Sequence, residues 1–154
     1  TVRGTVAPRI TPVRVIIDDM LTTSPDARLV ATAGEIRTIM LTSKAQLDSA
    51  AADAVRREGV ELIPMSDLAD GLRRLRESGI ERLLVEGGGR LAGALISTRN
   101  VDRFYHVQSP VWLGEQGRLA FVGLRAPELP DAERWRVVER RPLGQDTLIV
   151  MDRT

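Results

Sequence analysis

Residues 80–96 read IERLLVEGGGRLAGALI, and this stretch decides the expected fold. The segment from Ile80 to Val85, with apolar residues at Ile80 and at positions 83–85, is typical of a buried strand. A turn of three glycines follows, and the next apolar side chains recur at the spacing of one helical face: Leu91, Ala94 and Leu95. The stretch therefore predicts a strand, a tight turn and a helix in succession.

The same alternation extends toward the N-terminus. Short apolar runs predict four further strands: Val13–Ile17, the weaker run Arg28–Thr32, Thr38–Thr42 and Val60–Ile63. Apolar residues at helical spacing predict two helices, which end at Gly59 and Gly79, and Ser66 is the expected cap of the second. Because strands that alternate with helices form βαβ units, we expect a largely parallel sheet.

The pattern changes after Asn100. Three strands follow without helices between them: Val101–Gln108, Trp135–Glu139 and Thr147–Met151, the last two joined through Pro142-Leu143-Gly144. Consecutive strands of this kind pair as antiparallel neighbours. We therefore expect one α/β domain over residues 1–154, with a mixed, mostly parallel sheet and a C-terminal antiparallel hairpin.

Composition excludes several classes of protein. Of the 154 residues 43% are hydrophobic, which excludes wholesale disorder, and a net charge of +1 argues against a nucleic-acid binder. Without cysteine and with one histidine, His106, the sequence has no thiolate or paired-histidine metal site. No apolar run approaches the roughly 18 residues of a membrane span. We expect a cytoplasmic protein without metal, nucleic-acid or membrane partners, and a half-buried strand position for His106.

The glycine turn has two interpretations. It exposes backbone N–H groups at a helix N-terminus, which favours an anion such as phosphate, and glycine lets a ligand approach the main chain. The spacing is neither that of a Rossmann fingerprint nor that of a P-loop, so a plain strand-to-helix turn stays open. Gly93 lies inside the helix, where glycine costs ~1 kcal/mol against alanine, and this indicates close packing or a nearby ligand.

Acidic residues follow two of the predicted strands. Glu86 could accept hydrogen bonds from substrate hydroxyls or amines, or it could cap the helix. The pair Asp18-Asp19 could hold the hydroxyls of a ribose, or it could begin a turn. The residues alone leave both pairs of alternatives open.

The stretch LLVEGGGRLAGALI, residues 83–96, resembles the signature of the riboflavin-biosynthesis pyrimidine reductases. These enzymes form the C-terminal domain of the bifunctional pyrimidine deaminase/reductase. Other segments are similar to that family in the same order: Pro12–Asp18, Val101–Arg103 followed by Pro110 and Leu113-Gly114, and Gly144–Leu148. The resemblance covers essentially the whole chain.

The resemblance implies a dihydrofolate-reductase-like, three-layer fold and an NADPH-dependent enzyme. The implied reaction reduces the ribose of 5-amino-6-(5-phosphoribosylamino)uracil to a ribityl chain. A reductase of the related diaminopyrimidinone phosphate is one alternative, and a catalytically silent nucleotide-binding or dimerisation module is another.

The resemblance also implies roles for particular residues. Glu86 would contact the substrate, and Thr1-Val2-Arg3 is similar to a substrate-binding Thr-x-Arg segment in which Arg3 would hold the phosphate. The cofactor would be lined by Gly88, Gly89, Arg90, Leu91, Ala92, Gly93 and Ala94. Asp19 stands where the family has a small hydroxyl residue near the adenosine ribose. Because its carboxylate repels a 2′-phosphate, NADH is the alternative cofactor. No proton donor is assigned.

The family carries a first strand and further site residues ahead of the Thr-x-Arg segment. The resemblance therefore implies that the N-terminal part of the domain is missing from this sequence, and that activity belongs to the complete protein. The resemblance also allows fusion to an N-terminal zinc deaminase domain. We further expect a homodimer, with the loop around Val111 and Trp112 and the C-terminal strands as the candidate contact.

Overall fold

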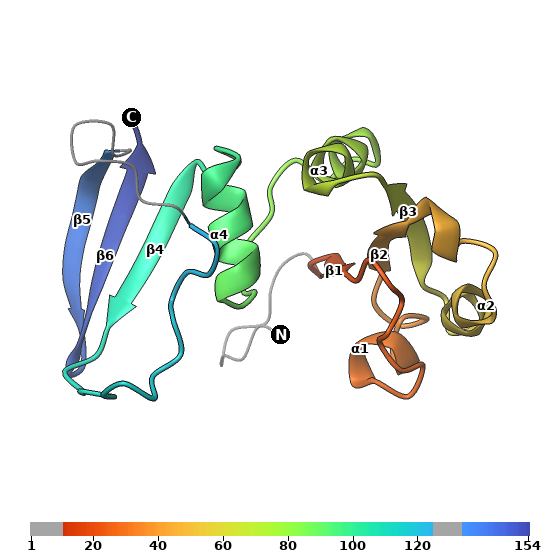
Figure 1. Cartoon of the computed structure of the whole chain (residues 1–154), viewed down its shortest axis with the longest axis horizontal. Coiled ribbons are helices and arrows are strands. Elements are labelled where there is room, and N and C mark those ends of the chain that lie inside the picture. The colour runs from red at the N-terminus through yellow and green to blue at the C-terminus, as the bar shows by residue number, and fades with distance from the viewer. Residues whose placement is uncertain (1–10, 125–133) are drawn as a thin grey trace. The chain divides into compact units, whose positions relative to one another are not determined.

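The computed structural model describes residues 11–124 and 134–154. It divides the chain into two compact units, Thr1–Arg82 and Leu83–Thr154 (Figure 1). Each unit contains a three-stranded sheet. Within the described ranges, no helix combines the length and apolarity needed to cross a membrane.

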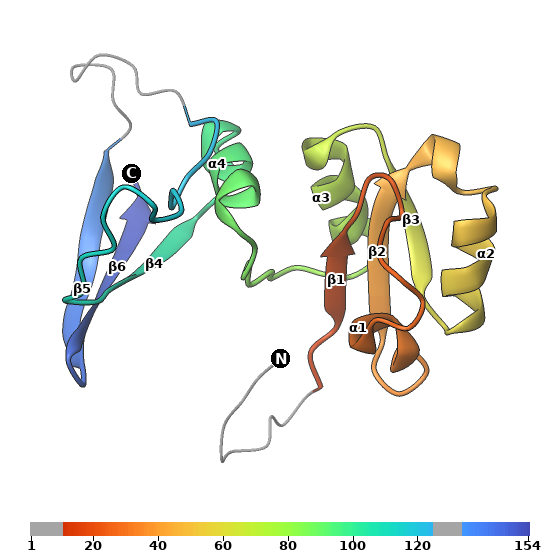
Figure 2. The same cartoon turned by 60° about the horizontal axis from the view of Figure 1, so that its bottom comes forward.

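The first unit is built on a parallel sheet. Its strands lie in the order β1 (Arg14–Ile17), β2 (Thr38–Ser43) and β3 (Glu61–Met65), and Figure 2 shows them side by side. The helices of this unit are α1 (Arg28–Ala31), the 3-10 turn η1 (Lys44–Gln46), α2 (Ala50–Arg57) and α3 (Leu68–Glu77). In Figure 1, α1 and α2 lie on one side of the sheet and α3 lies on the other, which makes three layers.

The alternation of side chains along β2 creates two cores. Met40 faces a cluster with Val30 of α1 and Val55 of α2, whereas Ile39 and Leu41 face a cluster with Leu75 of α3. All six residues are at most 1% exposed. The sheet is therefore buried on both faces, as parallel sheets generally are.

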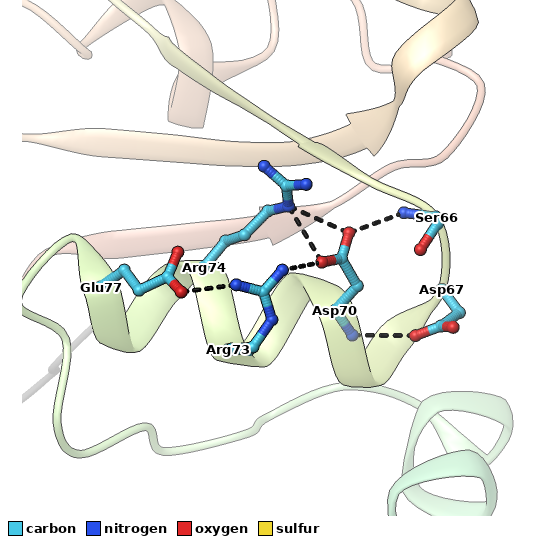
Figure 3. Close-up of polar contacts among 6 residues, drawn as sticks. All are labelled: Ser66, Asp67, Asp70, Arg73, Arg74 and Glu77. Carbon is cyan, nitrogen blue, oxygen red and sulfur yellow. Dashed lines mark hydrogen bonds and ion pairs between the residues drawn. The ribbon is translucent and has the colours of Figure 1, made fainter.

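Helix α3 has a polar network at its N-terminus (Figure 3). Asp67 is the N-cap, and its carboxylate accepts from the Asp70 backbone N–H at 2.8 Å. The Asp70 carboxylate accepts in return from the Ser66 backbone N–H at 3.0 Å and from the side chains of Arg73 and Arg74. This reciprocal arrangement is a form of capping box. The expected cap, Ser66, is therefore wrong by one residue.

The second unit combines helix α4 with an antiparallel sheet. Helix α4 runs from Gly89 to Ser97, and the strands are β4 (Arg103–Gln108), β5 (Trp135–Leu143) and β6 (Asp146–Arg153). Their order is β4-β6-β5, so the C-terminal hairpin forms as expected. Gly144 has a φ of +65° in the two-residue turn between β5 and β6, a conformation that favours glycine.

Two expected strands are wrong for this chain. Residues 81–88 form neither helix nor strand, and Leu84 is 73% exposed. A strand needs a hydrogen-bonded neighbour, and none of the described strands pairs with this run. The described strands consequently divide between two sheets. Residues 28–31 form α1 because Ala27, Val30 and Ala33 recur every three residues and pack into one core.

Candidate functional site

The N-terminus of α4 presents backbone N–H groups that no side chain of the described residues caps. Its N-cap is Gly88, and the first turn contains no acidic residue. Arg90 is exposed in that turn. A Cβ atom on Gly88 would meet nothing within 4 Å, so the main chain there is open to a ligand. Because the N–H groups carry the positive end of the helix dipole, this turn favours an anionic group such as a phosphate.

Two other glycines of the motif allow close packing. A Cβ atom on Gly89 would lie 2.7 Å from the Leu119 carbonyl oxygen, and one on Gly93 would lie 2.3 Å from the Val122 carbonyl oxygen. The Val122 backbone N–H also donates to the Gly89 carbonyl at 2.9 Å. The segment 119–122 therefore packs directly on α4. Of the two interpretations of Gly93, the structure supports close packing.

Glu86 lies in the exposed segment 81–88, three residues before α4 begins. It does not lie at the end of a strand, because the expected strand does not form. Its carboxylate nevertheless stands next to the glycine turn in sequence. The residues expected to line the cofactor, from Gly88 to Ala94, are brought together by the first two turns of α4.

Asp18 and Asp19 directly follow β1, at the carboxyl edge of the parallel sheet. The Asp18 carboxylate accepts from the Thr23 N–H at 2.7 Å, from the Thr23 hydroxyl at 2.6 Å and from the Thr22 hydroxyl at 3.2 Å. Burial raises the pKa of Asp18, but the hydrogen bonds from Thr23 and Thr22 together bring that pKa below its ordinary value. Asp18 thus closes a turn, whereas the side chain of Asp19 is exposed.

Sequence reasoning passed over Lys44, which directly follows β2 at the same edge of the sheet. The carboxyl ends of β1 and β2 are joined there, because the Ser43 N–H and the Thr42 hydroxyl both donate to the Asp19 carbonyl at 3.1 Å. Lys44 is exposed. Its signal in the sequence is that it is the sole lysine, against 21 arginines.

The other residues singled out in the sequence are Arg3, His106 and Trp112. Arg3 lies outside the described residues. His106 is half-buried on β4, as expected, with its ring centroid 6.2 Å from that of Phe104. Trp112 is 100% exposed, and its contact with a second subunit stays a prediction. In the part of the chain that the structure describes, no group of three or more acidic or histidine side chains could hold a metal ion.

The chain is similar to known proteins over nearly its whole length. Residues 1–149 match the family model described as the RibD C-terminal domain. The riboflavin biosynthesis protein RibD of Actinobacillus pleuropneumoniae is 29% identical over 145 residues, which are 90% of this chain and 38% of that protein. The 2,5-diamino-6-ribosylamino-4(3H)-pyrimidinone 5′-phosphate reductase of Methanothermobacter thermautotrophicus is 30% identical over 146 residues, which are 93% of this chain and 67% of that protein.

Solved structures share the fold. RibD of Acinetobacter baumannii aligns with a TM-score of 0.77 at 19% identity, over 92% of this chain and 37% of that one. A diaminohydroxyphosphoribosylaminopyrimidine deaminase/5-amino-6-(5-phosphoribosylamino)uracil reductase from Thermotoga maritima aligns with a TM-score of 0.75 at 23% identity, over 93% of this chain and 38% of that one. These likenesses confirm the expected dihydrofolate-reductase-like α/β fold. The chain spans about two fifths of the length of its RibD relatives. With the family model matched over residues 1–149, the chain belongs to the RibD C-terminal domain family, the pyrimidine reductases of riboflavin biosynthesis.

Proposed function

We propose that this chain forms the reductase domain of a riboflavin-biosynthesis enzyme that uses NADPH to reduce the ribose of 5-amino-6-(5-phosphoribosylamino)uracil to a ribityl chain. The observation that carries this proposal is the family match over residues 1–149, which includes the glycine turn. The match includes the whole of the first compact unit and all but the last five residues of the second, which supports a single domain. The name of the Thermotoga maritima neighbour contains the same reduction, which supports the choice of substrate.

The proposed cofactor site is the beginning of α4. The open main chain at Gly88 and the uncapped N–H groups after it would bind the cofactor phosphates. Gly89, Arg90, Leu91, Ala92 and Ala94 would complete that surface, with the guanidinium of Arg90 available for a phosphate oxygen, whereas Gly93 is buried against Val122. A bound nicotinamide would supply the hydride for C1 of the opened ribose. NADPH is the proposed cofactor, and NADH is the alternative because of Asp19.

Two residues are proposed to bind the substrate. The Glu86 carboxylate would accept hydrogen bonds from substrate hydroxyl or amine groups, and it directly precedes the proposed cofactor turn. Arg3 would hold the phosphate of the substrate through its forked guanidinium, which suits phosphate oxygens. Such contacts would fix the orientation of the sugar relative to the hydride donor, which is the main contribution a protein makes to this kind of reaction.

The test is oxidation of NADPH by the complete protein on addition of the phosphoribosylaminouracil. Glu86→Gln removes the charge of the side chain and keeps its shape. We expect kcat/KM to fall by roughly 10²-fold, because the loss of that charge would weaken about two hydrogen bonds to the substrate. Glu81→Gln is the matched control, because Glu81 is exposed in the same segment, and its kcat/KM should stay within about twofold of wild type. Equal activity in both variants would overturn the role of Glu86.

A second candidate substrate is the diaminopyrimidinone phosphate named for the Methanothermobacter relative, of which this chain covers 67%. Both substrates should therefore be assayed in parallel. A higher kcat/KM for the diaminopyrimidinone would make it the physiological substrate. Failure of a folded, complete protein to oxidise either nicotinamide cofactor with either substrate would favour the silent nucleotide-binding module instead.

The assembly and location of the enzyme belong to the same proposal. Homodimerisation is supported by the fully exposed Trp112 next to exposed Val111, and sedimentation of wild type against Trp112→Ser tests it. Fusion to a deaminase domain is supported by the RibD relatives, of which this chain covers 38% and 39%. A cytoplasmic location is supported by the cysteine-free sequence.

A further inference from the structure

A hollow of about 420 Å³ lies at one end of the antiparallel sheet, where β6 ends and where β4 and β5 begin. All the residues that line it are charged: Asp102, Arg103, Arg136, Asp152 and Arg153. Each lies on one of the three strands or directly precedes one, so the hollow belongs to the second unit alone. Three guanidinium groups and two carboxylates leave it with a net charge of +1, which favours an anion.

Asp152 fixes one of these guanidinium groups. It lies on the central strand, and its partners in register are Arg103 on β4 and Arg136 on β5, so the three side chains share one face of the sheet. Its carboxylate accepts from Arg103 Nε at 2.6 Å and from Arg103 Nη2 at 2.9 Å. These hydrogen bonds raise the pKa of Arg103 and bring the pKa of Asp152 below its ordinary value. The guanidinium of Arg103 is therefore charged and fixed in orientation.

Arg136 has the fewest polar contacts of the three arginines. Its side chain is 72% exposed, and its Nη2 lies 4.0 Å from the Asp152 oxygen that already accepts from Arg103 Nη2. Among the described residues, the guanidinium of Arg136 donates no hydrogen bond. Its N–H groups are thus available to a ligand in the hollow.

Arg153 brings the third guanidinium group to the hollow. Its Nη1 donates to the carbonyl oxygen of Arg99, which lies just beyond the end of α4. Its Nη2 lies 3.9 Å from the carboxylate of Asp102, a side chain that is fully exposed. The carbonyl orients Arg153 without neutralising its charge, and solvent weakens the pairing with an exposed carboxylate.

This arrangement of arginines fits a tetrahedral dianion. A carboxylate has two oxygens in one plane and pairs with one guanidinium fork, whereas the oxygens of a phosphate group point in several directions. Arginine forks suit phosphate oxygens, and the weak hydration of a guanidinium group lowers the cost of removing it from water. Three arginines on three strands can therefore contact different oxygens of one phosphate.

We propose that this hollow is a phosphate-binding site, in which Arg136 and Arg153 donate to the phosphate oxygens beside the fixed guanidinium of Arg103. The site is separate from the glycine turn. Arg153 contacts the chain beyond the last turn of α4, and the glycine turn lies at the beginning of that helix of 9 residues, about 13 Å away. The proposal therefore does not depend on the proposed reductase reaction. Its ligand class is a phosphate group, either free or in a monoester.

Protection from an arginine-modifying reagent tests the contact. The complete protein is treated with phenylglyoxal at constant ionic strength, and the modification of Arg136 is followed by peptide mass spectrometry. Inorganic phosphate with a Kd of about 5 mM would slow that modification about fivefold at about 20 mM, because the unliganded fraction falls to about one fifth. Arg140 is exposed on the other face of the same strand, opposite Ile149, and should be slowed less than about twofold. Equal slowing of Arg136 and Arg140 would overturn the proposal.

Substitutions give a second test, in which the protection of Arg153 is measured. Arg136→Gln should weaken phosphate binding about tenfold, since a charge-assisted hydrogen bond contributes about that factor, and Arg136→Lys should weaken it less because it keeps the charge. Asp102→Asn should strengthen binding, because it removes a carboxylate that repels the anion. Arg140→Gln is the matched control and should change the affinity less than about twofold. Unchanged protection of Arg153 in Arg136→Gln would contradict the proposed site.

Two further ligands identify the bound group. Sodium acetate at the same ionic strength should slow the modification of Arg136 less than about twofold, and slowing equal to that by phosphate would overturn the choice of a tetrahedral dianion. Glycerol 3-phosphate distinguishes the two sources of the phosphate group. Stronger protection than by inorganic phosphate assigns the site to a monoester, and equal or weaker protection assigns it to free phosphate. Because these measurements use neither NADPH nor the pyrimidine substrate, their outcome is independent of the proposed reaction.

Discussion

Gly88 and Gly93 stand five positions apart in one motif and face different surroundings. A Cβ on Gly93 would be 2.3 Å from a main-chain oxygen that cannot turn away, whereas one on Gly88 would meet nothing within 4 Å. Gly93→Ala should therefore destabilise the second unit by about 2 kcal/mol, although alanine favours a helix by about 1 kcal/mol. Denaturant unfolding measures this cost.

Gly88→Ala is the matched variant for that experiment. Gly88 has a φ of −74°, which alanine adopts readily, so its effect on stability should be no more than about 1 kcal/mol. Its expected effect is weaker cofactor binding, because the methyl group would stand where the main chain is open. Equal loss of stability in the two variants would contradict this division between packing and binding.

At the scale of residues, sequence reasoning predicts side-chain chemistry better than surroundings. It places the glycine turn directly before a helix and Asp19 at the carboxyl edge of the parallel sheet, but it places Glu86 at the end of a strand that does not form. It does not predict that Val122 packs on Gly93, because no local pattern marks a contact between residues 29 positions apart. The spacing of Gly89 and Gly93, one helical turn, is the signal that indicates such a close approach.

At the scale of elements, the polar network at the N-terminus of α3 makes the stability of that helix depend on pH. Hydrogen bonds from the Ser66 N–H, Arg74 and Arg73 lower the pKa of Asp70 from 3.8 to about 2. Because the folded pKa lies below the unfolded one, the stabilisation is complete above about pH 4 and is lost as the pH falls toward 2. Asp70→Asn should therefore lower the thermal midpoint at pH 7, and its difference from wild type should shrink below pH 4.

The control for that prediction lies in α2. Asp53 occupies the first turn of α2, and its side chain is 72% exposed with one ion pair at 3.3 Å. Asp53→Asn should shift the midpoint less than Asp70→Asn at pH 7, since exposed pairs contribute little. A difference between wild type and Asp70→Asn that stays constant down to pH 2 would show that the carboxylate charge is not what stabilises α3.

Elements whose apolar residues recur with a clear period are predicted well from sequence. Elements that form only when a neighbouring strand pairs with them are not. The periods of β2 and α3 suffice, because each buries one or two faces against its neighbours. The run 80–85 has the composition of a strand, but strand formation depends on a paired edge that composition does not report. The run 28–32 is similar in composition, and its period of three residues identifies it as helical.

At the scale of the whole molecule, the exposed segment 81–88 separates the two compact units in sequence. An exposed stretch without helix or strand is where proteases cut first, because the chain must be extended to enter their active sites. Brief digestion with trypsin should therefore cut after Arg82 earlier than after Arg56 or Arg74, which lie inside helices. Mass spectrometry of the fragments over time measures the order.

The opposite order of cleavage would also be informative. If Arg82 stays intact while Arg56 and Arg74 are cut, the segment is covered in solution, and its apolar residues Leu83 to Val85 have found a strand partner.

The fold class follows from sequence because strand–helix alternation and the late helix-free strands are both visible there. The division into two units does not follow from sequence, because it depends on whether the run 80–85 pairs with another strand.

The tight turn at Gly144 determines which strands of the second sheet pair first during folding. Strands β5 and β6 are joined by two residues, whereas Arg103 of β4 meets Asp152 of β6 across 49 positions. Hairpins close in about 1–10 μs, whereas pairing of strands that are distant in sequence has a larger entropy cost of loop closure. The hairpin should therefore be the nucleus of this unit. In stopped-flow refolding, Gly144→Val should slow folding, and Phe104→Ala on β4 should mainly speed unfolding; the reverse pattern would place the nucleus at β4.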